Sequence, residues 1–299
     1  MAETLSVVIN TKNAADTLER TLKSVAHADE IIVVDMHSSD DTLKIARKYT
    51  DRVFSHKDVG YVEPARNFAV SKASCDWVLV LDADEVLPAA LWQQLPELLA
   101  REEVAAYELP RKNMIFGKWL ENTGWWPDYQ ARLFRRASTT WSDSIHEPPQ
   151  VHGKLVQLPA DRAAAIEHYN YHSVSQFLEK LDRYTSITAV DAPSATVKSA
   201  DLIQTFSAEL LRRLFAARGI DEGVHGVALA YLQSMYQLVT QLKIWEKSGS
   251  SPTTNDQAEV IAALSQSTSD LRYWIADWHV QNTSGVSRFV WQIRRKMRW

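Results

Sequence analysis

Short apolar runs rich in β-branched residues alternate with helix-period segments over roughly the first hundred residues. Runs such as Leu5–Ile9, Glu30–Val34 and Trp77–Leu81 predict buried strands. Between them, the segment Asp16–Val25 places its apolar residues on one face, which predicts a crossover helix. Because strands that alternate with helices build a parallel sheet, the sequence predicts an α/β domain with a mostly parallel sheet flanked by helices.

The pattern changes after Leu109. From about 110 to 170 the periodicity fades, and we expect loops with short strands that shape a cleft. From Ser175 onward the pattern is helical. The composition of the segment 248–256 is typical of a linker. We therefore expect a domain over 1–170, a helical region over 171–247, this linker, and amphipathic helices over 257–299.

Composition excludes several classes of protein. A formal net charge of -4 on 299 residues gives no global basic field, which argues against a dedicated nucleic-acid binder. The single cysteine, Cys75, excludes an internal disulfide and a cysteine-based zinc site. No apolar stretch is long enough for a convincing transmembrane helix, and Met1–Thr4 carries no charged leader, so we expect a cytoplasmic protein.

Polar residues follow three of the predicted strands, at Asn10–Asn13, Asp35 and Asp82–Glu85. Ligands of open α/β sheets bind beyond the carboxyl ends of the strands, so these residues are candidates for a binding site. Asp82 and Asp84 would repel each other in a dry cleft, and a hard divalent cation would relieve that repulsion. The alternative interpretation is a solvated turn that caps the next helix.

The loop after the first strand contains no glycine, which excludes both the dinucleotide-binding fingerprint and the P-loop. Phosphate groups would have to be held by charge instead. A metal ion on Asp84, assisted by Arg66 and Lys12, would serve.

Two acidic residues are candidates for a general base. Asp128 lies in an aromatic loop, where a partly dry cleft would raise its pKa, although an Asp after a proline also forms turns. Glu147 is its rival. Two histidines, His146 and His168, would complete a metal shell or hold phosphates, or else be structural.

Tryptophans are dense in the same part of the chain. Their side chains would either stack on a sugar ring or form part of the hydrophobic core. These residues are Trp119, Trp125, Trp126 and Trp141.

The C-terminus is basic and amphipathic. No acidic residue follows Asp277, and Phe289, Ile293 and Met297 recur every four residues among arginines and lysine. Such a helix is typical of attachment to an anionic membrane surface. The alternative is a helix that docks on the protein itself.

Four segments, in order, resemble family 2 glycosyltransferases of GT-A fold, a Rossmann-like α/β architecture. They are Leu5–Asn13, Asp29–Asp35 with Ser38–Thr42, Pro64–Ala69, and Leu79–Glu85. Later segments are similar to the bacterial lipopolysaccharide-core β-glucosyltransferase branch of that family. They are Gly124–Arg135, His146–Glu147, His168–Tyr169 and Leu178–Tyr184.

The resemblance implies inverting transfer of a hexose, glucose, from a nucleotide-diphosphate sugar, UDP-glucose, to a hydroxyl of a lipopolysaccharide-core, lipid-linked or other glycan acceptor. Mg²⁺ or Mn²⁺ would bind the diphosphate, and the helices over 171–247 would complete the acceptor side. The enzyme would work as a peripheral protein on the inner face of the cytoplasmic membrane.

The resemblance also implies roles for particular residues. The donor would be bound by Thr11 and Asn13 at base and ribose, Asp35 at the uracil ring, Arg66 at the same pocket, Asp82 near the ribose, and Arg132. The metal would be bound by Asp84, with Asp82 and His146, and the catalytic residues would be Asp128 and Glu147. The chain departs from the family at Ala14–Ala15 and Met36–His37, next to the residues expected to bind the donor base.

Two other functions are weighed against this one. A sugar-1-phosphate nucleotidylyltransferase uses a related sheet but needs a glycine-rich first loop. A non-catalytic nucleotide-sugar-binding, membrane-associated protein would not need metal carboxylates together with a base.

Overall fold

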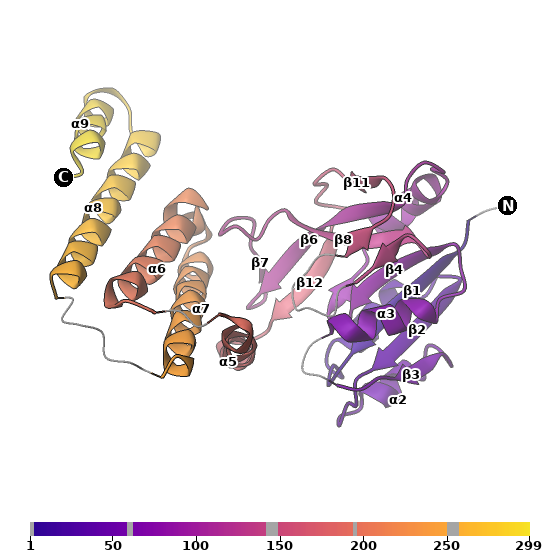
Figure 1. The fold of residues 1–299 in the computed structure, drawn as a ribbon. Helices are drawn as coiled ribbons and strands as arrows, with labels where there is room; N and C mark the ends of the chain where they lie inside the picture. Colours follow the sequence, from indigo (N-terminus) through magenta and orange to yellow (C-terminus); the bar gives the residue numbers. More distant parts are fainter. Residues whose placement is uncertain (1–2, 59–61, 142–148, 194–195, 250–256) are drawn as a thin grey trace. The chain divides into compact units, whose positions relative to one another are not determined.

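The computed structural model describes residues 3–58, 62–141, 149–193, 196–249 and 257–299. It divides into two compact units (Figure 1). The first unit comprises Met1–Met114 and Trp126–Asn170, and the second comprises Ile115–Trp125 and Tyr171–Trp299.

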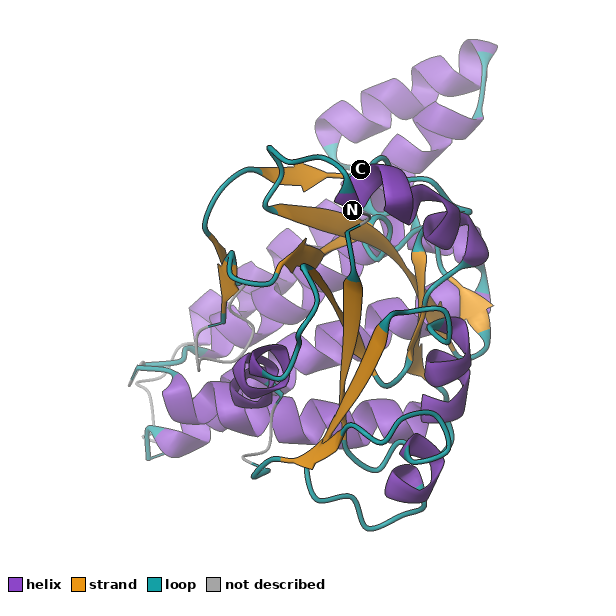
Figure 2. Cartoon of the chain, turned by 90° about the vertical axis from the view of Figure 1, so that its right-hand side faces the viewer, coloured by secondary structure: helices purple, strands orange, loops and turns teal. Residues whose placement is uncertain are grey.

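A single large sheet organises the first unit (Figure 2). Four of its strands are parallel, in the spatial order β3 (Val53–Ser55), β2 (Glu30–Asp35), β1 (Leu5–Thr11) and β4 (Trp77–Asp82). The order continues with β8 (Asp128–Arg135), β6 (Ala106–Ile115), β12 (Ile166–Tyr171) and β5 (Glu85–Val86). Strand β8 is antiparallel to both β4 and β6. The remaining strands are short: β7 (Lys118–Trp119), β9 (Thr139–Thr140), β10 (Gln150–Val151) and β11 (Leu155–Gln157).

Both faces of the parallel half are covered, and for that reason every residue of β1 is buried. On one face Ile9 packs with Leu22 of α1 (Leu18–Ser24) and Leu91 of α4 (Ala89–Leu99). On the other face Val8 packs with Ala69 of α3 (Glu63–Ser71). Helix α2 (Thr42–Ala46) is a short connection before β3. The α/β fold expected from the sequence is confirmed.

The expectation of loops and short strands between 110 and 170 is partly wrong. Strand β6 extends to Ile115, and β8 and β12 are full strands that pair within the large sheet. Their apolar alternation is broken by polar residues such as Arg111 and Asn113. Because the side chains of Arg111 and Asn113 take part in a buried polar network, the sequence of β6 lacks the alternation of apolar and polar residues that usually marks a strand.

Helices build the second unit. They are α5 (Val174–Asp191), α6 (Ser199–Leu211) with a π-helical turn at Arg212–Ala216, a 3₁₀ turn at Gly219–Glu222, α7 (Val224–Lys247), α8 (Gln257–Asn282) and α9 (Gly285–Met297). Helix α7 packs on α5 and α6, while α8 packs on α6 and α9. Phe177, Leu181 and Leu229 form part of its core. The expected linker, 248–256, lies outside the described residues from 250 onward.

Candidate active site

The turn that joins β4 to β5 carries the Asp-Ala-Asp sequence and is held from two directions. The hydroxyl of Thr21 on α1, which is fully buried, donates to the carbonyl oxygen of Ala83 at 3.0 Å. The backbone N–H of Tyr169 on β12 donates to the carbonyl oxygen of Asp84 at 2.9 Å. The turn is therefore fixed by the fold, unlike the solvated turn considered as the alternative.

Asp82 is clamped by two arginines. Nη2 of Arg66 lies 3.0 Å from Oδ1, and Nη2 of Arg132 lies 2.5 Å from Oδ2. Burial opposes ionisation, but the charges of Arg132 and Arg66 outweigh it and hold the pKa of Asp82 well below its ordinary value. Each carboxylate oxygen of Asp82 thus pairs with a guanidinium in this structure.

Glu85 is a fully buried carboxylate beneath this turn. It accepts from Arg132 at 2.6 Å and from Arg111 at 2.8 Å, and its other oxygen accepts from the backbone N–H of Asp82 at 3.0 Å. Burial lowers the pKa of Arg132, yet Asp82 and Glu85 raise it by more, so this guanidinium stays charged. Buried charges persist in a protein when they are paired in this way.

A histidine on β12 faces the second aspartate of the turn. Nε2 of His168 lies 3.5 Å from Oδ1 of Asp84. Nδ1 of His168 lies 2.7 Å from the side-chain oxygen of Asn113, which can only accept, so Nδ1 carries the hydrogen in this arrangement. Nε2 is then the ring nitrogen that faces Asp84.

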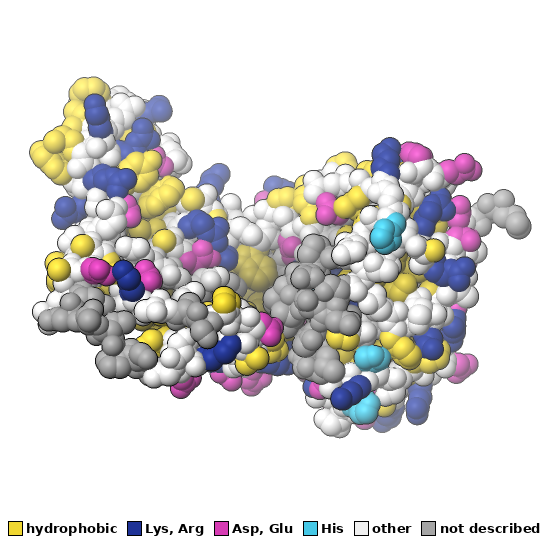
Figure 3. Space-filling view, viewed as in Figure 1, with side chains coloured by type: hydrophobic (Ala, Val, Ile, Leu, Met, Phe, Trp, Pro, Cys, Tyr) yellow, Lys and Arg dark blue, Asp and Glu magenta, His cyan; other side chains and the backbone are white. Residues whose placement is uncertain are grey.

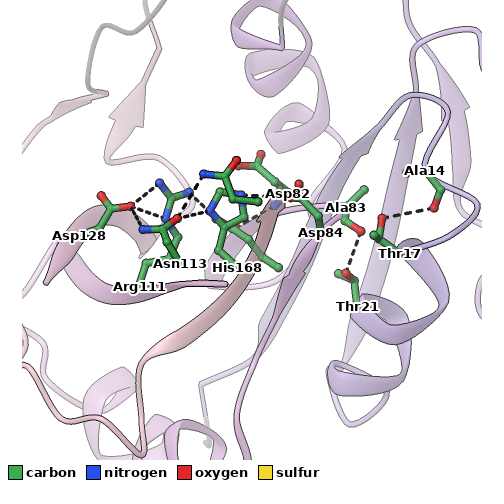
Figure 4. A network of polar contacts seen from close by, with 12 residues as sticks. Ala14, Thr17, Thr21, Asp82, Ala83, Asp84, Arg111, Asn113, Asp128 and His168 are labelled. Carbon is green, nitrogen blue, oxygen red and sulfur yellow. Dashed lines mark hydrogen bonds and ion pairs between the residues drawn. The ribbon is translucent and has the colours of Figure 1, made fainter. Parts of the chain in front are cut away.

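Asp128 belongs to the same network (Figure 4). Its Oδ2 accepts from Nε and Nη2 of Arg111 at 2.9 and 2.6 Å and from Nδ2 of Asn113 at 2.9 Å. Its Oδ1 accepts from Gln130 at 2.9 Å. Burial raises the pKa of Asp128, but the charge of Arg111 and the hydrogen bonds outweigh it, so the pKa is lowered. The expectation of a raised pKa at Asp128 is therefore wrong, because Arg111 faces it from β6.

Asp84 and His168 fit a shared divalent cation. Two neighbouring ligands of an octahedral Mg²⁺ at about 2.1 Å are about 3 Å apart, close to the separation seen here. The described residues contain no group of three or more His, Cys, Asp or Glu that could hold a metal ion, so further ligands would come from elsewhere. Two predicted residues, His146 and Glu147, lie outside the described residues.

Among the described residues, several buried polar atoms at the carboxyl ends of β1 and β2 have no hydrogen-bond partner. Thr11 and Asp35 are neighbours in the strand register, and each is 1% exposed. Oδ2 of Asp35 accepts from the N–H of Ser38 at 3.0 Å, while Oδ1 of Asp35 and the hydroxyl of Thr11 have no hydrogen-bond partner among the described residues. The side-chain amide of Asn10, which is 3% exposed, also has no hydrogen-bond partner in the part of the chain that the structure describes. Such atoms are costly unless something pairs with them, and this favours a polar ligand at this edge.

The loop residues beside this edge hold one another. Asn13, at a positive φ of 46°, accepts from the N–H of Ser39 at 2.8 Å, and its own N–H donates to Ser38 at 2.8 Å. Lys12 pairs with Asp58, so in this structure Lys12 is engaged by a carboxylate. Asn13 thus ties the loop after β1 to the loop after β2.

The tryptophans divide between the two units. Trp141 is 6% exposed and packs edge-on against Phe134, as a core residue does. Trp125 packs near Tyr171 in the second unit, where Trp119 also lies. Trp126 belongs to the first unit and is half-buried.

Sequence reasoning placed Asn10 and Glu85 among the candidate binding residues without giving either a role, and it missed Arg111 and Asn113. A signal was present for the two that were missed, because they occupy alternate positions of one strand and therefore face the same side.

Residues 6–147 match the family described as glycosyl transferase family 2. The match covers just under half of the chain, most of it in the first unit, whose mostly parallel sheet flanked by helices agrees with the fold expected from the sequence. The chain is 29% identical over 252 residues to an uncharacterized glycosyltransferase of Rickettsia conorii, covering 77% of this chain and 87% of that protein. It is 25% identical to the lipopolysaccharide core biosynthesis glycosyltransferase LpsC of Rhizobium meliloti, covering 81% of this chain and 92% of LpsC. Among solved structures, TarS (residues 1–349) of S. aureus matches with a TM-score of 0.43 and 16% identity, over 82% of this chain and 92% of that one.

Proposed function

We propose that this protein is a family 2 glycosyltransferase that transfers a hexose, glucose, with inversion from a UDP-sugar to a hydroxyl of a lipopolysaccharide-core or other lipid-linked glycan. The observation that carries the proposal is the continuous network that joins Asp84, His168, Asn113 and Asp128. It brings a pair of residues suited to a metal ion and a carboxylate suited to a base into one connected arrangement.

In this proposal the unpartnered atoms of Thr11 and Asp35 bind the nucleoside. Asp35 Oδ1 would accept from the N–H of a uracil ring, which a carboxylate oxygen does well. Arg66 lies against Asp82, at the start of the turn, and its Nε has no partner among the described residues. That atom is the one with which Arg66 would meet the donor.

Asp84 and His168 would hold Mg²⁺ or Mn²⁺, which when bound neutralises charge on the leaving diphosphate. The distance of 3.5 Å between Nε2 of His168 and Oδ1 of Asp84 supports this assignment.

Asp128 would take the proton of the acceptor hydroxyl through Oδ1, because Oδ2 already accepts three hydrogen bonds. Its lowered pKa keeps it deprotonated, as a base must be before the reaction. Arg111 would fix the orientation of the carboxylate, and it would also stabilise the charge of the resting state.

A lipid-linked acceptor is favoured by the likeness to LpsC, whose description is lipopolysaccharide core biosynthesis glycosyltransferase. Such an acceptor lies at a membrane surface, so the proposal includes peripheral attachment at the cytoplasmic face of the membrane.

The test is to incubate the purified protein with a panel of nucleotide sugars, Mn²⁺ or Mg²⁺, and lipopolysaccharide-core acceptors, and to follow the products by mass. We expect release of UDP and addition of one hexose to the acceptor, with UDP-glucose as the best donor. Release of a sugar-1-phosphate, or donor binding with no product from any donor, would contradict the proposal.

A further inference from the structure

Helix α9 packs on α8 through its polar side. Arg295 donates to Oδ1 of Asp277 at 2.6 Å, and the rings of Trp291 and His279 stack with their centroids 3.9 Å apart. On a helical projection, Trp291 and Arg295 lie on the same side of α9. A docked amphipathic helix usually turns its apolar side toward the protein and its polar side toward solvent. Helix α9 does the reverse, because its polar side faces α8.

The apolar side of α9 points away from α8. Apart from Trp291, which faces α8, its apolar residues fall within an arc of about 100° at 3.6 residues per turn. They are Val286, Phe289, Val290, Ile293 and Met297, and all are exposed, with Val286 at 81% and Phe289 at 62%. No residue of α9 is buried. This apolar arc is thus a surface that the fold leaves uncovered among the described residues.

Cations flank the apolar arc on both sides. Lys296 follows one border of the arc, beside Phe289, and Arg294 follows the other border, beside Val290; both are exposed. Long cationic side chains at the edge of an apolar surface reach toward phosphate groups while their stems stay in contact with apolar groups. No acidic residue follows Asp277, so no carboxylate of this helix opposes an anionic partner.

We propose that the apolar arc of α9 is the surface by which this protein attaches to an anionic lipid bilayer. The arc would enter the boundary between headgroups and acyl chains, with Arg294 and Lys296 on the headgroups. Docking on α8 and binding to a membrane are compatible, because they use opposite sides of the helix. Across the described residues, no helix combines the length and hydropathy needed to cross a bilayer.

A second copy of the chain fits this surface less well. Two α9 helices paired by a two-fold axis would bring Arg294 and Lys296 of each copy close to the same cations of the other, and like charges repel. An anionic bilayer meets both the arc and its cations with favourable interactions.

The test is flotation of the full chain with vesicles of phosphatidylcholine alone or with phosphatidylglycerol added, without donor or acceptor. We expect at least about tenfold more bound protein on the anionic vesicles, falling as salt is raised. The double substitution Phe289→Glu and Ile293→Glu should reduce binding at least about tenfold. The matched control is Ile261→Glu on α8, since Ile261 is also 62% exposed, and it should bind like the wild type.

Equal flotation of the double variant and the wild type would overturn the proposal. So would self-association of the wild type, lost in the double variant, without any binding to vesicles. The proposed function explains why the protein would attach to a membrane, because its acceptor would lie there. Membrane attachment and sugar transfer are measured separately, so either proposal can fail while the other stands. The double variant should still transfer sugar to a small soluble acceptor. If the wild type floats with anionic vesicles but transfers no sugar, only the proposed reaction is contradicted.

Discussion

Nδ1 of His168 lies 2.7 Å from the side-chain oxygen of Asn113, and the nitrogen of that same amide lies 2.9 Å from Oδ2 of Asp128. One fully buried amide thus orients both the imidazole beside Asp84 and the carboxylate proposed as the base. The two functional groups cannot change orientation independently while Asn113 is present.

Asn113→Ala should therefore weaken two functions at once. Removing such an outer partner of a metal ligand typically costs about ten- to a hundredfold in metal affinity or activity, and we expect both Mn²⁺ affinity and turnover to fall within that range. Electron paramagnetic resonance of free Mn²⁺ measures the first, and UDP release measures the second. Asn170→Ala is the control, because its amide lies 3.4 Å from Asn113 and should matter less. Unchanged Mn²⁺ affinity in Asn113→Ala would show that Asn113 does not position the metal ligands.

Asp84→Asn and His168→Gln test the metal pair directly. Asp84→Asn removes the negative charge and His168→Gln removes the imidazole, while each keeps the approximate size of the side chain, so each should abolish the Mn²⁺-dependent part of UDP binding in a titration. The melting temperature should stay nearly unchanged. The exposed Asp51, changed to Asn, controls for general loss of charge. Wild-type turnover of Asp84→Asn would refute its assignment.

Asp128→Asn tests the base. Loss of a general base lowers turnover by about a hundred- to ten-thousandfold, and we expect at least the lower figure, with a donor Kd close to that of the wild type. Glu147→Gln is measured alongside it. If Asp128→Asn turns over normally and Glu147→Gln does not, the base is Glu147.

The pH dependence of the reaction should reflect the lowered pKa of Asp128. Because Arg111 and the hydrogen bonds favour the charged carboxylate, Asp128 stays deprotonated below the ordinary Asp value, and kcat/KM should show no acid limb from it above about pH 5. Arg111→Gln removes the opposing charge, so the pKa should rise and an acid limb should enter the measured range. Arg101→Gln breaks only an exposed pair with Glu97 and should leave the profile unchanged. An identical profile for Arg111→Gln and the wild type would contradict this account.

The parallel half of the fold was predictable because its strands are buried on both faces and read as apolar runs. The antiparallel half was not, because β6 carries Arg111 and Asn113 where a strand pattern calls for apolar residues. The position of Asp84 just after a buried strand was also predictable, whereas Asp128, expected in a loop, begins strand β8. What the sequence could not give is the pairing of β6 with β8, which sets Arg111 opposite Asp128 across 17 residues of chain. The aromatic neighbours of Asp128 suggested a raised pKa. This register places Arg111 beside Asp128 instead, and the charge of Arg111 lowers the pKa.

Thr21 gives a prediction about a residue that touches neither metal nor donor in the proposal. Its fully buried hydroxyl on α1 donates to the carbonyl oxygen of Ala83, and so holds the middle of the turn proposed to bind the metal. Thr21→Val keeps the shape but leaves that carbonyl without its donor, at a cost of about 1–3 kcal/mol in the free energy of unfolding. The turn that carries Asp84 should also loosen.

The matched control for Thr21→Val is Thr185→Val. Thr185 is equally buried, and its hydroxyl donates at 2.8 Å to the carbonyl oxygen of Leu181 within α5. In a helix that oxygen keeps its backbone hydrogen bond when the hydroxyl is removed, so Thr185→Val should be less destabilising and should leave Mn²⁺ affinity unchanged. Chemical denaturation measures the first difference, and Mn²⁺ titration of the folded variants measures the second. We expect weaker Mn²⁺ binding in Thr21→Val alone. If both variants bind Mn²⁺ like the wild type, the hydrogen bond from Thr21 stabilises the domain without positioning Asp84.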